Sequence, residues 1–87
     1  MTGNCEICGK WRPLDQHEVF SGPNRQKSKK YGLVMHVCRW CHTQSPTCVQ
    51  YCRETNLFYK QKYQRIFEET HTREQFMQEF GKNYLDD

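Results

Sequence analysis

Two Cys-x-x-Cys pairs are the feature that most constrains how this chain of 87 residues can fold. Cys5 and Cys8 form the first pair, Cys38 and Cys41 form the second, and 29 residues (9–37) lie between them. A knuckle with this short spacing places two thiolates on one face, and two knuckles supply the four sulfur ligands of a closed, tetrahedral zinc site. The sequence therefore predicts one structural zinc ion (Zn²⁺) bound by these four cysteines.

Disulfide bonds are the alternative use of six cysteines in so short a chain. No charged-then-apolar signal segment is visible before the first knuckle, so we expect a reducing, cytoplasmic compartment in which zinc binding is favoured. No apolar run approaches the ~20 residues of a membrane span, and no membrane partner is expected. The remaining cysteines, Cys48 and Cys52, lie four apart in a segment with helical character and are interpreted as buried packing residues.

Length and charge indicate a single domain over residues 1–87. A chain this short, with 36% hydrophobic residues, buries little apolar surface and is expected to depend on the zinc for stability. Residues 1–44 contain seven Lys or Arg and three acidic residues, whereas residues 45–87 contain six Lys or Arg and seven acidic residues. The basic half is therefore the zinc-binding half. We expect it to be a zinc ribbon with a β-hairpin, followed by a helical hairpin over 45–87.

The first strand of this hairpin is predicted over residues 14–20, and it carries a histidine. Asp15, His17 and Glu18 lie at its centre, so neither face of the strand is cleanly apolar. Such a local inconsistency is typical of a functional site. A second, more apolar strand is predicted over residues 33–37 and leads into the second knuckle.

A cationic segment lies between the two predicted strands. Residues 21–24 have the composition of a turn, and residues 25–32 are expected to form a short helix ended by Gly32. This helix contains four cations that either face nucleic-acid phosphates or form a solvated surface, and the sequence leaves both interpretations open: Arg25, Lys27, Lys29 and Lys30.

The pattern after His42 predicts two helices. Pro46 stands at a plausible first position of a long amphipathic helix. Its apolar stripe recurs at spacings of three and four residues through Val49, Cys52, Asn56, Tyr59, Tyr63 and Ile66. A second helix is predicted to open with a capping box at Thr72 and to end at Gly81. Its expected inner face is Phe76, Met77 and Phe80, and the two helices are expected to cover the ribbon.

Several of these motifs together resemble the HNH endonucleases, in the short stand-alone form that phages carry. The resemblance covers nearly the whole chain. It rests on the first knuckle, His17-Glu18-Val19-Phe20, Gly22-Pro23-Asn24-Arg25, Lys30-Tyr31-Gly32-Leu33, the ending Cys38-x-x-Cys41-His42 of the ribbon, and the tail Phe80-Gly81-Lys82-Asn83-Tyr84-Leu85.

The resemblance implies a ββα-metal fold, in which a β-hairpin and the following helix bind one catalytic cation, Mg²⁺ or Mn²⁺. His42 matches the family's metal-binding histidine, and His17 matches the first member of a strand pair that supplies a metal ligand and then a general base. Glu18 then stands at the base position; with the register shifted by one residue, His17 is the base. Asn24 is the candidate for the family's middle asparagine. Gln50 stands where related short proteins have a further histidine.

Two functions of different class follow from the resemblance. The first is a metal-dependent DNA endonuclease, with His17, Glu18, Asn24 and His42 at the catalytic centre and the four cations of residues 25–30 on the DNA backbone. The second is a catalytically degenerate HNH-like binding protein. It would inhibit a host defence protein such as an RNA-guided nuclease, in the manner of anti-CRISPR proteins. Both place the chain in the cytoplasm of a bacterial host cell, and the sequence predicts no oligomeric state.

Overall fold

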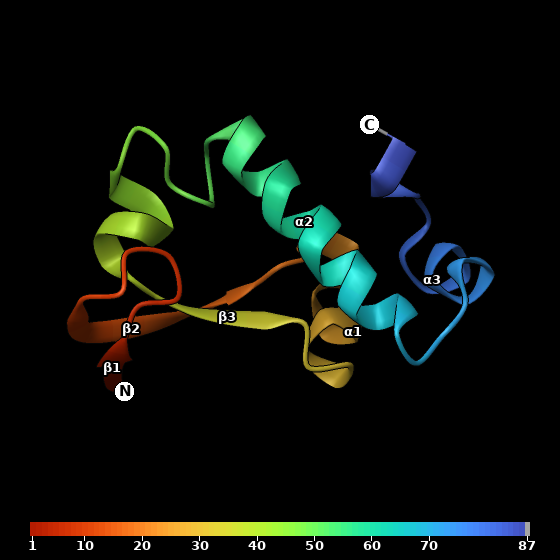
Figure 1. The fold of residues 1–87 in the computed structure, drawn as a ribbon, viewed down its shortest axis with the longest axis horizontal. Coiled ribbons are helices and arrows are strands. Elements are labelled where there is room, and N and C mark those ends of the chain that lie inside the picture. Colours follow the sequence, from red (N-terminus) through yellow and green to blue (C-terminus); the bar gives the residue numbers. More distant parts are fainter. Residues whose placement is uncertain (87) are drawn as a thin grey trace.

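A three-stranded antiparallel sheet carries both cysteine knuckles. In the computed structural model, which describes residues 1–86, strands β1 (Thr2–Asn4), β2 (Trp11–Glu18) and β3 (Val34–Cys38) lie in the order β1-β2-β3 (Figure 1). The first knuckle forms the turn between β1 and β2, where Gly9 has a φ of 76° that glycine adopts readily. The second knuckle lies at the end of β3. The protein is thus a small α+β domain with both knuckles at one end of its sheet.

Strand β2 begins earlier than the predicted strand because it has two partners. Its first residues pair with β1, with Trp11 opposite Asn4, and its later residues pair with β3, with His17 opposite Met35. The sequence indicated no strand before the first knuckle, so the β1 pairing was missed. The second predicted strand is confirmed with a shift of one residue, since β3 spans Val34–Cys38 and not 33–37.

Helix α1 (Arg25–Lys30) confirms the short helix predicted for the cationic segment, and it follows a 3-10 turn, η1 (Gly22–Asn24). Gly32 has a left-handed φ of 71° just after the helix. The buried Ser28 hydroxyl accepts the Phe20 backbone N–H at 3.2 Å and donates to the Leu33 carbonyl. These bonds turn Phe20 out of the sheet and into the core, so the predicted strand over 14–20 is two residues too long at its end.

The long helix α2 spans Arg53–Glu68, so the predicted start near Pro46 is wrong. Strand β3 leads into a single π-helical turn, η2 (Trp40–Gln44), and the chain then passes through irregular turns. The Val49 and Gln50 backbone N–H groups donate to the carbonyls of Cys41 (2.9 Å) and His42 (3.1 Å). Because these two N–H groups bond back to η2, they are not available to extend α2 toward Pro46.

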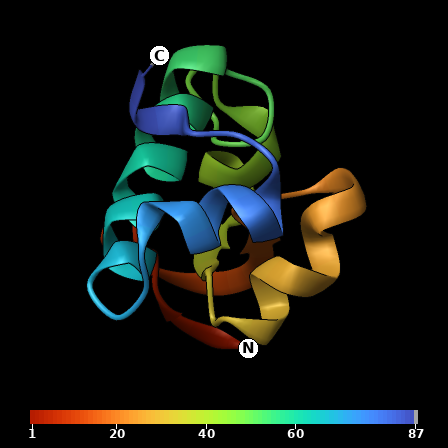
Figure 2. The ribbon, with the colours of Figure 1, turned by 90° about the vertical axis from the view of Figure 1, so that its right-hand side faces the viewer.

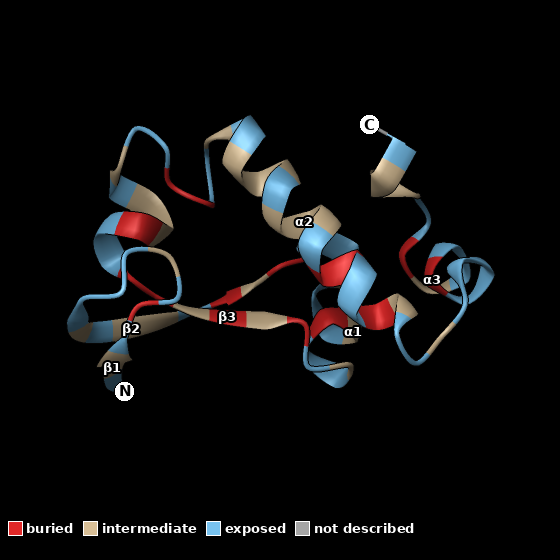
Figure 3. Ribbon diagram, viewed as in Figure 1, coloured by how far each residue is buried: buried red, intermediate tan, exposed pale blue. Residues whose placement is uncertain are grey.

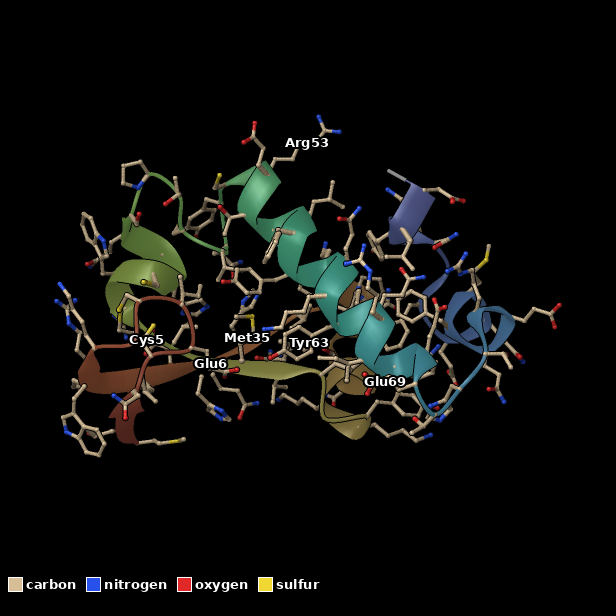
Figure 4. All side chains as sticks on the ribbon, viewed as in Figure 1. Cys5, Glu6, Met35, Arg53, Tyr63 and Glu69 are labelled. Atoms are coloured by element: carbon tan, nitrogen blue, oxygen red, sulfur yellow. The ribbon has the colours of Figure 1, made fainter. Side chains whose placement is uncertain are left out.

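Helix α2 lies across one face of the sheet (Figure 1), and Tyr63 lies over Met35 of β3 (Figure 4). Its buried side faces the sheet in Figure 3. Tyr63 and Phe67 are buried, whereas Ile66 is 40% exposed, so the predicted stripe is correct at Tyr63 and wrong at its last member. Phe67 follows Tyr63 by four residues and continues the same face in its place. The Tyr63 hydroxyl also donates to the Glu6 carboxylate at 3.2 Å, which joins α2 to the first knuckle.

Helix α3 (Arg73–Phe80) opens with the predicted capping box between Thr72 and Gln75 and ends at Gly81, whose φ is 79°. Phe76 and Phe80 are buried as predicted, but Met77 is 45% exposed, so its assignment to the inner face is wrong. Figure 2 shows α3 in front, with α2 on one side and α1 on the other. It packs on aromatic residues away from the knuckles, with the Phe20 and Phe80 ring centroids 4.7 Å apart.

The last described turn, η3 (Tyr84–Asp86), is held on α2 by one buried amide. The Gln64 side chain accepts the Tyr84 backbone N–H (2.9 Å) and donates to the side chains of Asn83 (2.7 Å) and Glu68 (2.8 Å). Within residues 1–86, no helix is long and apolar enough to cross a membrane.

Replacing this buried amide should destabilise the fold. We expect Gln64→Ala to lower the free energy of unfolding by about 1–3 kcal/mol, because three hydrogen-bonding partners lose their bonds in a buried setting. Chemical denaturation measures the change. Arg65→Ala, at the exposed neighbouring position of the same helix, is the matched control and should change the stability by less than ~0.5 kcal/mol. Equal losses in the two variants would show that Gln64 has no special role.

Candidate functional site

The structure brings the two knuckles together as one four-cysteine cluster. Cys5 and Cys8 come from the β1–β2 turn, Cys38 ends β3, and Cys41 lies in η2. Their Sγ atoms all lie within 4.8 Å of one another, and those of Cys8 and Cys38 are 3.8 Å apart. Cys8 alone is exposed, and the other three are buried. This grouping agrees with the ligand set that the sequence predicts.

The geometry fits a metal ion such as zinc and not disulfide bonds. A Zn–S bond of ~2.3 Å in a tetrahedron separates two sulfur atoms by ~3.8 Å, which matches the Cys8–Cys38 distance. The Cys5 Sγ accepts backbone N–H groups of Ile7, Cys8 and Cys38 at 3.4–3.5 Å. Burial opposes ionisation of Cys5, but these hydrogen bonds lower its pKa to about 6, which favours the thiolate that a metal requires. All six cysteines, each within the described chain, are free thiols.

Cys48 and Cys52 do not join this cluster. Cys48 is buried and Cys52 is half-buried, in agreement with a packing role, although they lie in turns and at the start of α2 and not within a helix.

A second site is a pocket of about 290 Å³ between the end of β2, α1 and η2. It gathers three of the four residues predicted to be catalytic, together with Gln50. The lining residues are Gln16, His17, Glu18, Ser21, Arg25, His42 and Gln50, and we call this the histidine pocket.

His17 is the buried member of the histidine pocket. The residue is 4% exposed, and its Nε2 atom makes no hydrogen bond of normal geometry within residues 1–86, although the Gln50 side chain lines the same pocket. The His17 and His42 rings lie edge to face, with centroids 5.3 Å apart. Burial, and then the proximity of His42, lower the pKa of His17 from 6.5 to about 4. The imidazole is therefore neutral at pH 7, which is the form that binds metals.

His42 is oriented by a carboxylate. Its Nδ1 lies 3.0 Å from Oδ2 of Asp15, which also accepts the Arg39 Nε–H at 2.7 Å. Hydrogen bonds from Arg39 and His42 lower the pKa of Asp15 to about 2, so the carboxylate is ionised and can only accept. A hydrogen bond to this carboxylate requires a proton on Nδ1 of His42, so Nε2 is the nitrogen through which the neutral form of the ring could bind a metal.

Glu18 is not free in the pocket. Its carboxylate accepts the Arg25 Nε–H and lies 3.9 Å from the Lys29 ammonium. Burial is the largest single effect and favours the neutral form, but the hydrogen bond and charge of Arg25, together with the charge of Lys29, outweigh it and lower the pKa of Glu18. A carboxylate with a lowered pKa is a weak proton acceptor.

The other predicted contact residues lie outside the pocket. The Asn24 side-chain amide donates to the Phe80 carbonyl at 3.1 Å, so it holds the end of α3. Lys27 donates to the Glu79 carbonyl at 2.7 Å, and Lys30 lies over the Tyr31 ring at 5.3 Å. The four predicted phosphate contacts therefore all have partners within the chain.

Arg39 is a site residue that sequence analysis did not select, and Asp15 was noted there only as one of the polar residues at the centre of its strand. Asp15 and His17 are two apart on one strand, so the strand period already placed them on the same face. Nothing in the sequence indicated that Arg39, the residue after β3, would donate a hydrogen bond to Asp15 of β2. Within residues 1–86, the four cysteines are the one group of three or more His, Cys, Asp or Glu side chains whose ligand atoms converge as in a metal site.

Comparisons with protein-family models, curated proteins and solved structures found no match for this chain.

The cysteine cluster should make folding depend on metal. We expect about one zinc per purified chain. We expect Cys38→Ser to lose both the zinc and cooperative unfolding, because the metal binds only the folded chain and its binding free energy therefore stabilises the fold. Elemental analysis and circular dichroism measure the two effects. Cys48→Ser removes a buried thiol outside the cluster and should keep the zinc. A chain that folds without metal would contradict the assignment.

The buried His17 should make stability depend on pH. The unfolded chain takes up a proton near pH 6.5, whereas the folded chain takes it up near pH 4. Stability is therefore full above pH 6.5 and falls as the pH is lowered toward 4. We expect the loss due to His17 to be on the order of 1–2 kcal/mol at pH 5.

The difference in unfolding free energy between the wild type and His17→Asn measures this loss. Protonation of the cysteines also destabilises the fold in acid, but it acts on both proteins and cancels in the difference. A difference that stays constant from pH 7.5 to pH 5 would contradict the burial of a neutral His17.

Proposed function

We propose that this protein is a metal-dependent DNA endonuclease of the HNH type that hydrolyses phosphodiester bonds at the histidine pocket. The observation that carries the proposal is the paired arrangement of His17 and His42. Among the residues that the structure describes, the buried Nε2 of His17 has no hydrogen-bond partner, and His42 is oriented by Asp15 through its Nδ1.

This arrangement has the features of two metal ligands. A carboxylate that fixes the tautomer of a histidine is the usual outer partner of a metal-binding imidazole, and Asp15 stands in that relation to His42. The low pKa of His17 keeps its ring unprotonated and available. A bound divalent cation would supply charge neutralisation at the phosphate and would orient the attacking water.

The residues of the pocket also indicate which cations to test. Mg²⁺ prefers oxygen ligands, whereas imidazole nitrogens favour later transition metals such as Ni²⁺. Besides the two imidazoles, the pocket offers the neutral oxygens of Gln16, Ser21 and Gln50, and the Glu18 carboxylate is already paired with Arg25. We therefore expect activity with Mn²⁺ or Ni²⁺ to exceed activity with Mg²⁺.

Proton transfer is expected to be the slowest step of the proposed reaction. Glu18 stands at the base position of the HNH motif, and its ion pair with Arg25 and Lys29 lowers its basicity. The same pair occupies two cations that would otherwise contact DNA phosphates. Slow cleavage is therefore expected.

The ion pair at Glu18 also favours a second candidate function. In this alternative the chain is a catalytically degenerate HNH-like protein that keeps the scaffold and inhibits a host defence protein such as an RNA-guided nuclease. The pairing of Glu18 with Arg25 and Lys29 supports this candidate. Cations that are already paired with a carboxylate of the protein attract a substrate phosphate less strongly.

A plasmid nicking assay tests the proposal. Purified protein and supercoiled plasmid are incubated with Mg²⁺, Mn²⁺ or Ni²⁺. We expect His42→Ala to reduce nicking at least a hundredfold, because an open metal site that lacks one ligand no longer orients water and phosphate. The same variant should keep its zinc, since His42 is not in the cysteine cluster. His36→Ala on β3, outside the histidine pocket, is the matched control and should nick like the wild type.

Glu18→His separates the two candidates. It replaces the weak base with an imidazole and releases Arg25, so we expect faster nicking if the scaffold is that of a nuclease. No nicking by either the wild type or Glu18→His, with zinc retained, would reject the enzyme and favour the binding protein. Release of zinc by His42→Ala would show that the two sites are one.

A further inference from the structure

We infer that the groove beside the cysteine cluster binds a segment of single-stranded nucleic acid, with a base stacked on Trp40. The groove has a volume of about 690 Å³, and Cys8, Cys38 and Cys41 of the cysteine cluster line it, so part of this volume is the place of a bound metal. It lies between the start of β2, the first knuckle and η2, and it is separate from the histidine pocket. Binding at this groove does not require that the protein cleaves DNA.

The groove offers cations and no carboxylate. Lys10, Arg12 and Arg39 line it, and none of its lining residues, all within the described chain, is acidic. Arg39 is paired with Asp15, and a divalent metal bound by four thiolates would carry a net charge of about −2, which Lys10 and Arg12 together about balance. The attraction for phosphate is therefore modest. A ligand that binds mainly through its negative charge is not the one that fits this groove best.

Base stacking on Trp40 is expected to contribute more to the binding free energy than these charges. Its side chain lines the groove and is 50% exposed, although a tryptophan gains more than most residues from burial. An exposed aromatic ring beside cations is the arrangement by which proteins bind single strands, since every base has a face that can stack. Bases in a duplex are already stacked on one another, so a single strand fits better than a duplex.

The groove is linked to the histidine pocket through η2. This turn places Trp40 in the groove and His42 in the pocket, two residues apart. Arg39 lines the groove and donates to Asp15, the same carboxylate that orients His42. A strand bound at Trp40 would therefore contact the same turn that carries His42, but on a different side of that turn, because residues two apart in a helical turn do not face each other.

The chain contains two tryptophans, which allows a direct optical test. Trp11 is 69% exposed on β2 but does not line the groove. Trp11→Phe leaves Trp40 as the only tryptophan, and its fluorescence is titrated with oligothymidylate without added divalent cation. We expect quenching of Trp40 by the single strand and little quenching by a duplex of equal length.

Affinity measurements complete the test. We expect Trp40→Ala to weaken binding about five- to hundredfold and Trp40→Phe to weaken it less, whereas Trp11→Ala, the matched control, should bind like the wild type. Lys10→Ala with Arg12→Ala should lower the salt slope by roughly one unit, at ~0.7 per phosphate contact. Zinc content confirms that each variant is folded.

Specific outcomes would overturn the inference. Unquenched Trp40 fluorescence at saturating oligonucleotide would do so, as would equal losses in Trp40→Ala and Trp11→Ala. Binding of polyglutamate as tight as that of oligothymidylate would show a cationic surface for acidic partners. Loss of nicking with quenching intact rejects only the proposed enzyme. Nicking without quenching rejects only this groove.

Discussion

The four-cysteine cluster is the contact on which the rest of the structure depends. It joins the β1–β2 turn to the end of β3 and the start of η2, which are separated by about 30 residues of chain. A three-residue β1 and a single π-helical turn have few hydrogen bonds of their own, so a metal-bound cluster would supply the stability that local structure lacks. The position of η2 then fixes His42, and the hydrogen bonds from Val49 and Gln50 return the following segment to it.

Aromatic packing stabilises the opposite end of the molecule. Phe20 leaves the sheet and contacts Phe76 and Phe80 of α3, while Phe67 of α2 contacts the same two rings. These contacts bury rings that are far apart in sequence. Each aromatic pair stabilises the fold beyond the contribution of the apolar area that it buries. The histidine pocket lies between the end of the molecule that carries the four-cysteine cluster and the aromatic end, and β2 supplies Gln16, His17 and Glu18 to it.

Two carboxylates of β2, each paired with residues of neighbouring elements, determine the electrostatics of the pocket. The Asp15 carboxylate orients His42 and is itself held by Arg39, whereas the Glu18 carboxylate is paired with Arg25. The first pairing prepares an imidazole for a ligand, and the second weakens a base. Both pairings cross between elements, so they depend on the register of β2 against β3 and on the placement of α1.

The sequence by itself determined the cysteine ligand set, the short helix α1, the capping box of α3 and its buried Phe76 and Phe80. Each depends on residue type and short spacing, which local sequence carries. It also placed His17, Glu18 and His42 as candidates for one site. Only the tertiary structure decided the pairing of β1, the late start of α2 and the exposure of Ile66 and Met77. It alone showed that Asn24 caps a distant helix and that Arg39 reaches Asp15. These features depend on contacts between residues far apart in the chain, whose free energies outweigh local preference and which no local pattern encodes.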